Sequence, residues 1–301
     1  MKGAGIGVVL VLVYTGMMAA ADGITKFIAG GYAAPQLFAL SSALVVLMAY
    51  GGSKTTVAGP LKVISVWPMA IRSGLTVVAS LAFFMAFRLL PFADVFLFIG
   101  LIPLIAAALS GPVLNEPPRP MAWAALILGL GGIVFLMPGG LSDMQAGHFW
   151  AVLAAVTGGG SMIAARYIAK AERVPMAQVF WPNLALLVVM GLALPFVWKP
   201  MSLTDLGWVG AYAVVLFGAR YVVVEALRLL PAFVAIPLMN LQFVWMVAIG
   251  ALFFSELPTL GTLLGVMMVV ASGIWLVVEE TLGKIRDMRR QVTAASATPA
   301  E

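Results

Sequence analysis

The tetrapeptide Arg88-Leu-Leu-Pro91 occurs a second time in this chain as Arg228-Leu-Leu-Pro231, 140 residues later (228 − 88 = 140). The same offset relates Glu116 to Glu256. It also pairs Ile28-Ala29 with Ile168-Ala169, Pro35 with Pro175, Pro60 with Pro200, and Pro118 with Pro258. If the match of this Leu-rich tetrapeptide were due to chance, so many prolines and a glutamate would not recur at the same offset. The chain is therefore predicted to contain two copies of one structural unit.

The composition places this chain in a membrane. Of its 301 residues 63% are hydrophobic and 10% are charged, whereas soluble domains carry about 25% charged residues. The net charge of +5 does not indicate a nucleic-acid partner, because the cations form no basic face and instead report orientation in the bilayer. The chain has no cysteine, which excludes disulfides and thiolate chemistry.

Ten segments are apolar enough to cross a bilayer, for which about 20 residues are needed. A helix is predicted for each, because backbone groups in lipid must be satisfied within the segment, and the alternation of a transmembrane barrel is not seen. Lys2 and the first segment imitate a signal peptide, but we interpret that segment as the first span. The ten segments are 5–27, 35–50, 67–89, 92–114, 121–137, 148–169, 177–198, 206–229, 232–254 and 259–278.

The basic residues predict that both termini are cytoplasmic. With the N-terminus inside, thirteen of the 17 Lys and Arg residues, Arg72 among them, are assigned to the inner side. The outer side holds only Lys26, Arg88 and Lys199, and Arg220 falls inside a span. This asymmetry follows the positive-inside rule. We expect a multi-pass protein of the bacterial inner membrane.

Each repeat contains five spans, so the second copy must enter the membrane upside down. We therefore predict an all-α integral membrane protein with two inverted five-helix repeats, at residues 1–140 and 146–282, and a basic, disordered tail at 283–301. Inverted repeats are a common plan of secondary transporters, whose substrate site lies near the midplane between the halves.

Several motifs, which occur in both halves, resemble a known family. They are Leu114-Asn-Glu116-Pro117 and Phe254-Ser-Glu256-Leu at the ends of spans four and nine, Leu128-Gly-Leu-Gly-Gly-Ile133 and Val269-Val-Ala-Ser-Gly-Ile274 in the spans that follow, and Leu90-Pro-Phe-Ala-Asp94. With the ten inverted spans, they resemble the EamA family of the drug/metabolite transporter superfamily, in its ten-span bacterial type. The resemblance covers nearly the whole chain. It implies a central cavity lined chiefly by spans one, three, four, six, eight and nine.

Arg220 is the first candidate substrate-binding residue. It falls near the middle of span 206–229, where a charge costs at least ~2.5 kcal/mol unless it faces a polar cavity or an acid. It is predicted to bind an anionic group such as a carboxylate. The alternative is a structural ion pair with Glu225 or with an acid on a neighbouring span. Its counterpart in the first repeat is Ser80, so the halves differ at this site.

Two aspartates are candidate proton-coupling residues. Asp22 belongs to a ladder with Tyr14, Met18 and Lys26 on the first span. Tyr14 is then expected in the cavity, and the alternative role of Asp22 is an ion pair with Lys26 at the interface. Asp94 lies in the first turn of span four, where the helix dipole stabilises a carboxylate whatever its role.

Uncharged groups complete the predicted binding site. Trp181 and Trp245 could stack on a planar substrate, although packing against lipid or core is the alternative. Asn240 and Gln242 could bond to substrate or across helices. The Gly158-Gly-Gly160 patch beside Ser161 in span six is predicted either to face the substrate or to let helices pack closely.

Four further charged residues are predicted to be structural. Glu116 and Glu256 recur in both repeats, on opposite faces, and are expected to cap helices or to tie loops to the next span. Arg88 and Arg228 lie at helix ends, where Arg228 can pair with Glu225.

These residues predict a secondary active transporter for a small polar or amphipathic metabolite, amino-acid-like or carboxylate-bearing, exported by alternating access. The alternative is uptake of a nucleoside-like metabolite or vitamin. The rival of another class is a membrane-embedded lipid-modifying enzyme, although no nucleophile–His pair, metal cluster or phosphate-binding loop is found in the sequence. We expect no enzymatic activity, no cofactor, no metal and no nucleic-acid partner. The expected partners are a small-molecule substrate, the lipid bilayer, and a proton or other coupling ion, in a monomer or homodimer.

Overall fold

Lipid favours helices in this chain, because each amide and carbonyl group must find its partner within the same segment. The computed structural model describes residues 2–54, 60–90, 102–117, 146–231 and 238–253, with single positions between and after these ranges. Within these residues every regular element is a helix, and no strand occurs. The predicted all-α class is confirmed for this part of the chain.

Six helices in the described part are long and apolar enough to cross a membrane, and each matches one predicted span to within a few residues. They are α1 (Lys2–Ala29), α2 (Ala34–Gly52), α3 (Val66–Leu89), α7 (Ala146–Ala171), α8 (Pro175–Val197) and α9 (Leu203–Leu229).

Shorter elements cover parts of two more predicted spans. They are α5 (Ile102–Leu114), the 3₁₀ turn η2 (Met239–Leu241) and α11 (Gln242–Phe253). The predicted spans 121–137 and 259–278 and the tail 283–301 lie largely or wholly outside the described residues. The count of ten spans therefore stays a prediction.

The outer surface of the bundle is suited to lipid. Phe196 and Leu203 are each 88% exposed, and Leu252 is 78% exposed. Monomeric soluble proteins rarely leave large apolar patches in water, so these side chains indicate contact with acyl chains.

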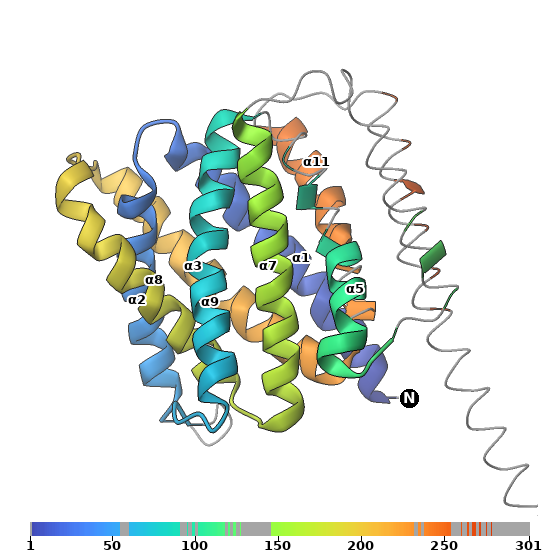
Figure 1. Cartoon of the computed structure of the whole chain (residues 1–301). Coiled ribbons are helices and arrows are strands. Elements are labelled where there is room, and N and C mark those ends of the chain that lie inside the picture. The colour runs from blue at the N-terminus through green and yellow to red at the C-terminus, as the bar shows by residue number, and fades with distance from the viewer. Residues whose placement is uncertain are drawn as a thin grey trace, which may run out of the picture.

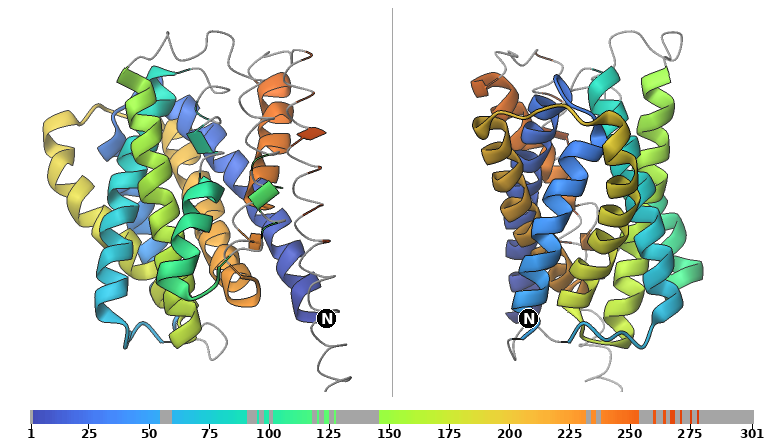
Figure 2. Two further views of the ribbon diagram at one scale, coloured as in Figure 1. Left: turned by 45° about the vertical axis from the view of Figure 1, so that its right-hand side comes forward. Right: turned by 90° about the vertical axis from the view of Figure 1, so that its left-hand side faces the viewer.

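Counterpart helices of the two predicted repeats run in opposite directions. α1 and α3 run upward in Figure 1, from the end of the bundle where the N-terminus lies, whereas α7 and α9 run downward. The views in Figure 2 agree. We call the end at which α1 begins the N-terminal face and the other end the opposite face.

The packing between the halves is reciprocal. α1 packs against α9, and α3 packs against α7. A Cβ atom on Gly7 would lie 2.7 Å from Cγ of Leu230, and one on Gly147 would lie 2.6 Å from Cγ of Leu90. The offset of 140 converts one contact into the other (7 + 140 = 147; 90 + 140 = 230). At both places glycine lets a leucine from the other half approach the helix backbone.

At each face a loop of one half is bonded to the start of a helix of the other half, again reciprocally. At the opposite face the Tyr32 hydroxyl donates to Oδ2 of Asp205 at 2.7 Å. At the N-terminal face the Ser65 amide donates to Oε1 of Glu172 at 2.8 Å. These pairs are also related by the offset (32 + 140 = 172; 65 + 140 = 205). Both lie at the ends of the packed pair α2 and α8.

Replacing Gly147 with alanine is expected to destabilise the protein. The added methyl group would meet the Leu90 and Leu89 side chains, and overpacking of this kind costs about 1–3 kcal/mol. We expect a lower apparent Tm in detergent. Gly210→Ala in α9 is the matched control, because a Cβ there meets nothing within 4 Å, and alanine is the better helix former. Equal Tm values for the two variants would contradict this packing.

Candidate functional site

A cavity of about 200 Å³ lies between helices of both halves. The helices that line it include α1, α3, α5, α7 and α9, together with η2 and the start of α11, which are the spans that the family resemblance implies. Five predicted site residues line the cavity, namely Tyr14, Asp22, Ser80, Arg220 and Asn240. The other polar side chains of the lining are Thr25, Arg72, Thr76, Ser161, Tyr212 and Gln242.

Arg220 lies so deep in α9 that its side chain can reach water only through the cavity. It lies nine residues from the end of α9 (229 − 220 = 9), or about 14 Å at 1.5 Å per residue. It shares the lining face of α9 with Tyr212, Leu216 and Val223, at spacings of three or four residues. Glu225, its suggested partner, instead bonds to Arg228 at 2.9 Å. Among the described residues no ion pair of Arg220 is found.

The predicted ladder on α1 brings three of its four members to the cavity, namely Tyr14, Met18 and Asp22. The fourth, Lys26, is not part of the lining. A helix face repeats every three to four residues, so this ladder forms one stripe. The carboxylate of Asp22 accepts a hydrogen bond from Nε2 of Gln242 at 2.5 Å. A hydrogen-bond partner of Asp22 therefore lies on another helix, α11.

The position of Gln242 depends on a break in helix geometry. The 3₁₀ turn η2 leads directly into α11, and Met239, Asn240 and Gln242 all line the cavity at this junction. A tighter turn inside a membrane segment is tolerated where the backbone borders a polar space rather than lipid. Gln242, weighed above only as one of several polar groups, thereby reaches Asp22 across the cavity.

Arg72 is a site residue that the sequence-based interpretation missed. It is assigned above to the inner basic residues, but it lies in α3, is only 6% exposed and lines the cavity. Its Nε and Nη1 atoms have no hydrogen-bond partner. The signal that could have found it is the spacing of four that Arg72, Thr76 and Ser80 share within one apolar span. That spacing predicts one polar stripe on a helix.

The small residues of α7 border the cavity on one side and allow close packing on another. Gly158 lines the cavity. A Cβ on Gly159 would lie 3.3 Å from Ile105, so this glycine allows α5 to approach closely. Ser161 and Thr76 are 2.8 Å apart, oxygen to oxygen, and join α7 to α3 beside the cavity.

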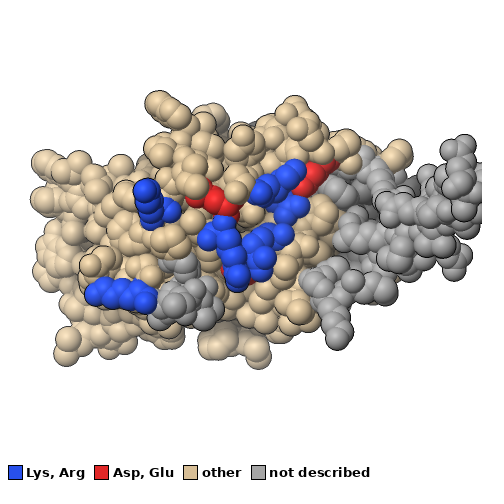
Figure 3. Space-filling model, turned by 90° about the horizontal axis from the view of Figure 1, so that it is seen from below, with Lys and Arg blue, Asp and Glu red and all other residues tan. Residues whose placement is uncertain are grey.

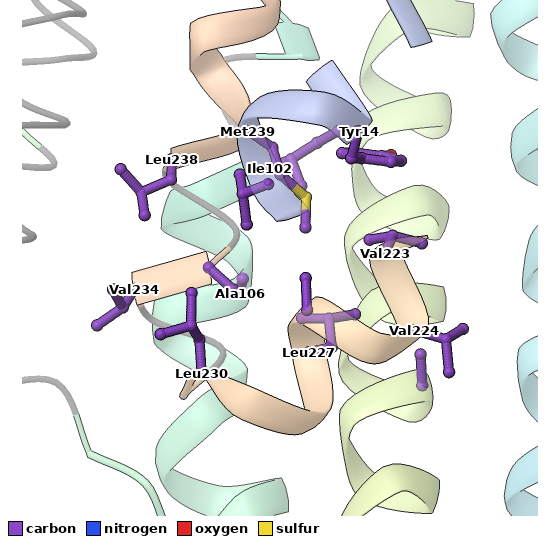
Figure 4. Packing of buried hydrophobic residues seen from close by; sticks show 14 of the residues in the cluster. Tyr14, Ile102, Ala106, Val223, Val224, Leu227, Leu230, Val234, Leu238 and Met239 are labelled. Carbon is purple, nitrogen blue, oxygen red and sulfur yellow. The ribbon is translucent and has the colours of Figure 1, made fainter. Parts of the chain in front are cut away.

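The remaining wall is apolar. Figure 4 shows Tyr14 of α1, Ile102 of α5 and Met239 of η2 lying opposite Val223 and Leu227 of α9. All five side chains line the cavity. Aromatic rings on the wall are those of Tyr14, Phe38, Phe83, Phe84, Phe87 and Tyr212. Such a wall excludes bulk water and strengthens the electrostatic interactions of the charged side chains that line the cavity in the described part of the chain.

Glu116 ties three helices together at the N-terminal face. Asn115, at φ 55°, ends α5 in the left-handed conformation, and its amide donates to Gly111 O, a helix-ending bond that asparagine accommodates. Glu116 then reaches α7, where Arg166 Nη2 lies 2.8 Å and Lys170 Nζ 3.2 Å from Oε1. Arg166 also donates to Leu227 O at the end of α9. Glu116 therefore contacts the sixth predicted span, while the fifth, to which it was expected to tie its loop, lies largely outside the described residues.

The other predicted structural cations lie away from the cavity. Arg228 pairs with Glu225, as its spacing suggests. Arg88 is exposed at the last turn of α3. It borders a separate surface depression with Tyr32 and Lys199 at the opposite face.

Two predicted substrate ligands do not line the cavity. Trp181 is 39% exposed and donates its indole N–H to Leu61 O at 2.9 Å. Trp245 is 48% exposed and packs over Gly16. We therefore leave both out of the site. Asp94 and Glu256 lie outside the described residues.

Metal binding finds no support among the residues that the structure describes. No group of three or more His, Asp or Glu side chains is placed there to hold an ion. The described lining offers two guanidinium groups, one carboxyl group and several neutral hydrogen-bonding groups.

Comparisons with known proteins find a family profile that matches part of the chain and a solved structure with a similar fold. The sequence profile of the EamA-like transporter family matches residues 145–278. A solved crystal structure of a protein with 18% sequence identity aligns with 91% of this chain and 96% of its own, with a TM-score of 0.68. At this identity the likeness extends to the fold alone. No curated protein matches the chain.

Glu116→Gln is expected to remove a pH-dependent part of the stability. Burial alone would raise the pKa of Glu116, but Arg166 and Lys170 outweigh it and hold that pKa below its ordinary value of 4.5. Stability from this group is therefore present above pH 4.5 and is lost as the pH falls through the lower folded pKa. Between pH 7 and pH 3.5 the apparent Tm of the wild type should fall more than that of Glu116→Gln. Parallel curves would contradict the ion pair.

Proposed function

We propose that this protein is a secondary active transporter, because residues 145–278 match the profile of the EamA-like transporter family. It moves a small amino-acid-like or carboxylate-bearing metabolite across the inner membrane by alternating access. Transport, and not catalysis, is the activity of this family. The site residues are Arg220 and Tyr14 with Ser80 and Asn240, and Asp22 is the coupling residue.

The proposal includes ten spans in two inverted repeats, at 1–140 and 146–282. The reciprocal contacts Gly7–Leu230 and Gly147–Leu90 support it, as do the opposite directions of α1 and α7 (Figure 1). An inverted pair of halves enclosing a cavity has two equivalent ways to close, one at each face, which is the basis of alternating access.

Arg220 in the cavity is the observation that carries the proposal. A guanidinium ion enclosed by helices and aromatic rings, with no ion pair among the described residues, is strongly disfavoured unless an anion or water solvates it. A carboxylate satisfies it best, through charge-assisted hydrogen bonds in a fork geometry. The proposed substrate therefore presents a carboxylate to Arg220.

Asp22 supports export as the direction. When it is ionised it can hold a substrate ammonium group, and when it is protonated it cannot. Substrate and proton then exclude each other, which is a negative coupling between two ligands. Where the proton gradient points inward, a proton that arrives at Asp22 from outside favours release of substrate to that side. Uptake would require the two ligands to bind together.

Both termini are proposed to be cytoplasmic. Figure 3 shows Lys and Arg side chains gathered on the N-terminal face. The helices that end there carry Lys170 in the last turn of α7 and Arg228 in the last turn of α9, and Lys54 follows α2. Cytoplasmic ends are rich in such residues.

Substrate counterflow in proteoliposomes tests the proposed function. Vesicles loaded with a mixed panel of amino acids, carboxylates, nucleosides and vitamins are expected to exchange carboxylate-bearing solutes. Arg220→Gln should reduce that exchange at least about tenfold, because hydrogen bonds to charged groups contribute about 1.5–3 kcal/mol. Arg88→Gln is the matched control, since Arg88 is exposed and away from the cavity, and it should exchange normally.

No exchange of any solute by folded protein would refute the transporter proposal and would favour the lipid-modifying enzyme. Exchange restricted to nucleosides or vitamins would favour the second candidate. Equal loss in Arg220→Gln and Arg88→Gln would show that Arg220 has no specific role.

Single cysteines test the orientation, since the chain has none of its own. Gly31→Cys lies in the loop after α1, where a Cβ meets nothing within 4 Å, and Lys54→Cys lies beyond the other end of α2. A membrane-impermeant maleimide is expected to label Gly31→Cys from outside intact cells. It should label Lys54→Cys only after the membrane is opened. The reverse pattern would overturn the proposed topology.

A further inference from the structure

We propose that the substrate is a small amino dicarboxylate, a molecule with two carboxylates and one ammonium group, and that Arg72 binds its second carboxylate. This inference rests on the proposed function and defines the substrate class of the same cavity. Arg220 binds one carboxylate, Arg72 binds the other, and Asp22 binds the ammonium group.

Arg72 is buried with unused hydrogen-bond donors, which is typical of a ligand-binding side chain. It is 6% exposed, it lines the cavity, and Nε and Nη1 have no hydrogen-bond partner in the protein. Buried polar groups are normally satisfied, and an exception needs an explanation. A structural arginine of this chain looks different, because Arg166 bonds to Glu116 and to two backbone carbonyls at the end of α9. The free donors of Arg72 are therefore assigned to substrate.

The two arginines come from different helices and line the same cavity. Arg72 lies on α3, six residues from its start (72 − 66 = 6), and Arg220 lies on α9, nine residues from its end. Both of these helix ends lie at the N-terminal face (Figure 1). Asp22 lies on α1, seven residues from the end at the opposite face (29 − 22 = 7). The cavity thus has a cationic end and an acidic end.

The charges of the cavity match this substrate class in number and sign. Among the described residues the lining carries two guanidinium groups and one carboxyl group, and an amino dicarboxylate carries two carboxylates and one ammonium group. Each charged group of the substrate then meets a described side chain of opposite sign in a low-dielectric space, where an uncompensated charge is costly. A neutral amino acid would leave one arginine unpaired, and a dicarboxylate without an amine would leave Asp22 without its cation.

The dimensions of the cavity agree. Pockets for drug-sized ligands measure about 300–1,000 Å³, and this cavity has about 200 Å³. It therefore suits a compact solute. The neutral donors and acceptors of Tyr14, Ser80 and Asn240 also line it and can complete the hydrogen bonds of a carboxylate.

Aspartate and asparagine provide the sharpest test, since they have nearly the same shape and differ by one carboxylate. In counterflow the wild-type protein is expected to exchange L-aspartate or L-glutamate in preference to L-asparagine and to succinate. Arg72→Gln should lower the ratio of aspartate to asparagine exchange at least about tenfold. Asparagine exchange should fall less than aspartate exchange in this variant, because asparagine has no second carboxylate for Arg72 to bind.

Asp22→Asn tests the ammonium group independently. It should shift the preference from aspartate toward succinate, which lacks only the amine, while Arg88→Gln should change neither ratio. A structural role for Arg72 or Asp22 would reduce all exchange together and leave the ratios unchanged.

The outcomes separate this inference from the proposed function. Exchange of asparagine at least as good as that of aspartate, with loss in Arg220→Gln, would overturn the amino dicarboxylate and leave the transporter standing. A preference of the wild type for succinate would overturn the role of the ammonium group, and with it this substrate class. No exchange of any solute would remove both.

Discussion

A charged side chain is energetically costly in the interior of a bilayer unless the protein provides a polar space for it. This requirement determines how the helices are arranged. Backbone amide and carbonyl groups bond to one another within helices. The charged side chains of Asp22, Arg72 and Arg220 need polar surroundings from elsewhere. They lie on α1, α3 and α9 and line one cavity. The helices surround that cavity with apolar side chains turned outward to lipid. The packing of the helices therefore also encloses the charged groups.

The scaffold follows the internal repeat, whereas the cavity departs from it. Gly7 meets Leu230 and Gly147 meets Leu90, so each half presents the same surface to the other. In the cavity the counterpart of Arg220 is Ser80, and the counterpart of Arg72 is Tyr212. Packing between halves requires only matching shapes, which two copies can share. Recognition of a solute that is itself asymmetric requires different groups on each side.

Much of the fold could be predicted from sequence, because bilayer thickness dictates the length of an apolar segment. Arg220 could be predicted as well, since a charge deep in a span has no route to water except a cavity. Arg72 could not, because a long side chain six residues from a helix start can also reach water at the surface. Only the neighbouring helices decide that it turns inward. For the same reason the sequence does not decide whether Trp181 and Trp245 face the cavity. Their amphipathic indoles suit a cavity or a surface, and tertiary packing decides which of the two they reach.

The hydrogen bonds at the two faces have a mechanical consequence. The Tyr32–Asp205 bond joins the loop before α2 to the first turn of α9, and the Ser65–Glu172 bond joins the start of α3 to the loop before α8. Each of the two helices that carry an arginine of the cavity is thus held at its first turn by a loop of the other half. A tilt of α3 or α9 about these held ends would change the distance between the guanidinium groups of Arg72 and Arg220 and alter their contacts with a bound anion.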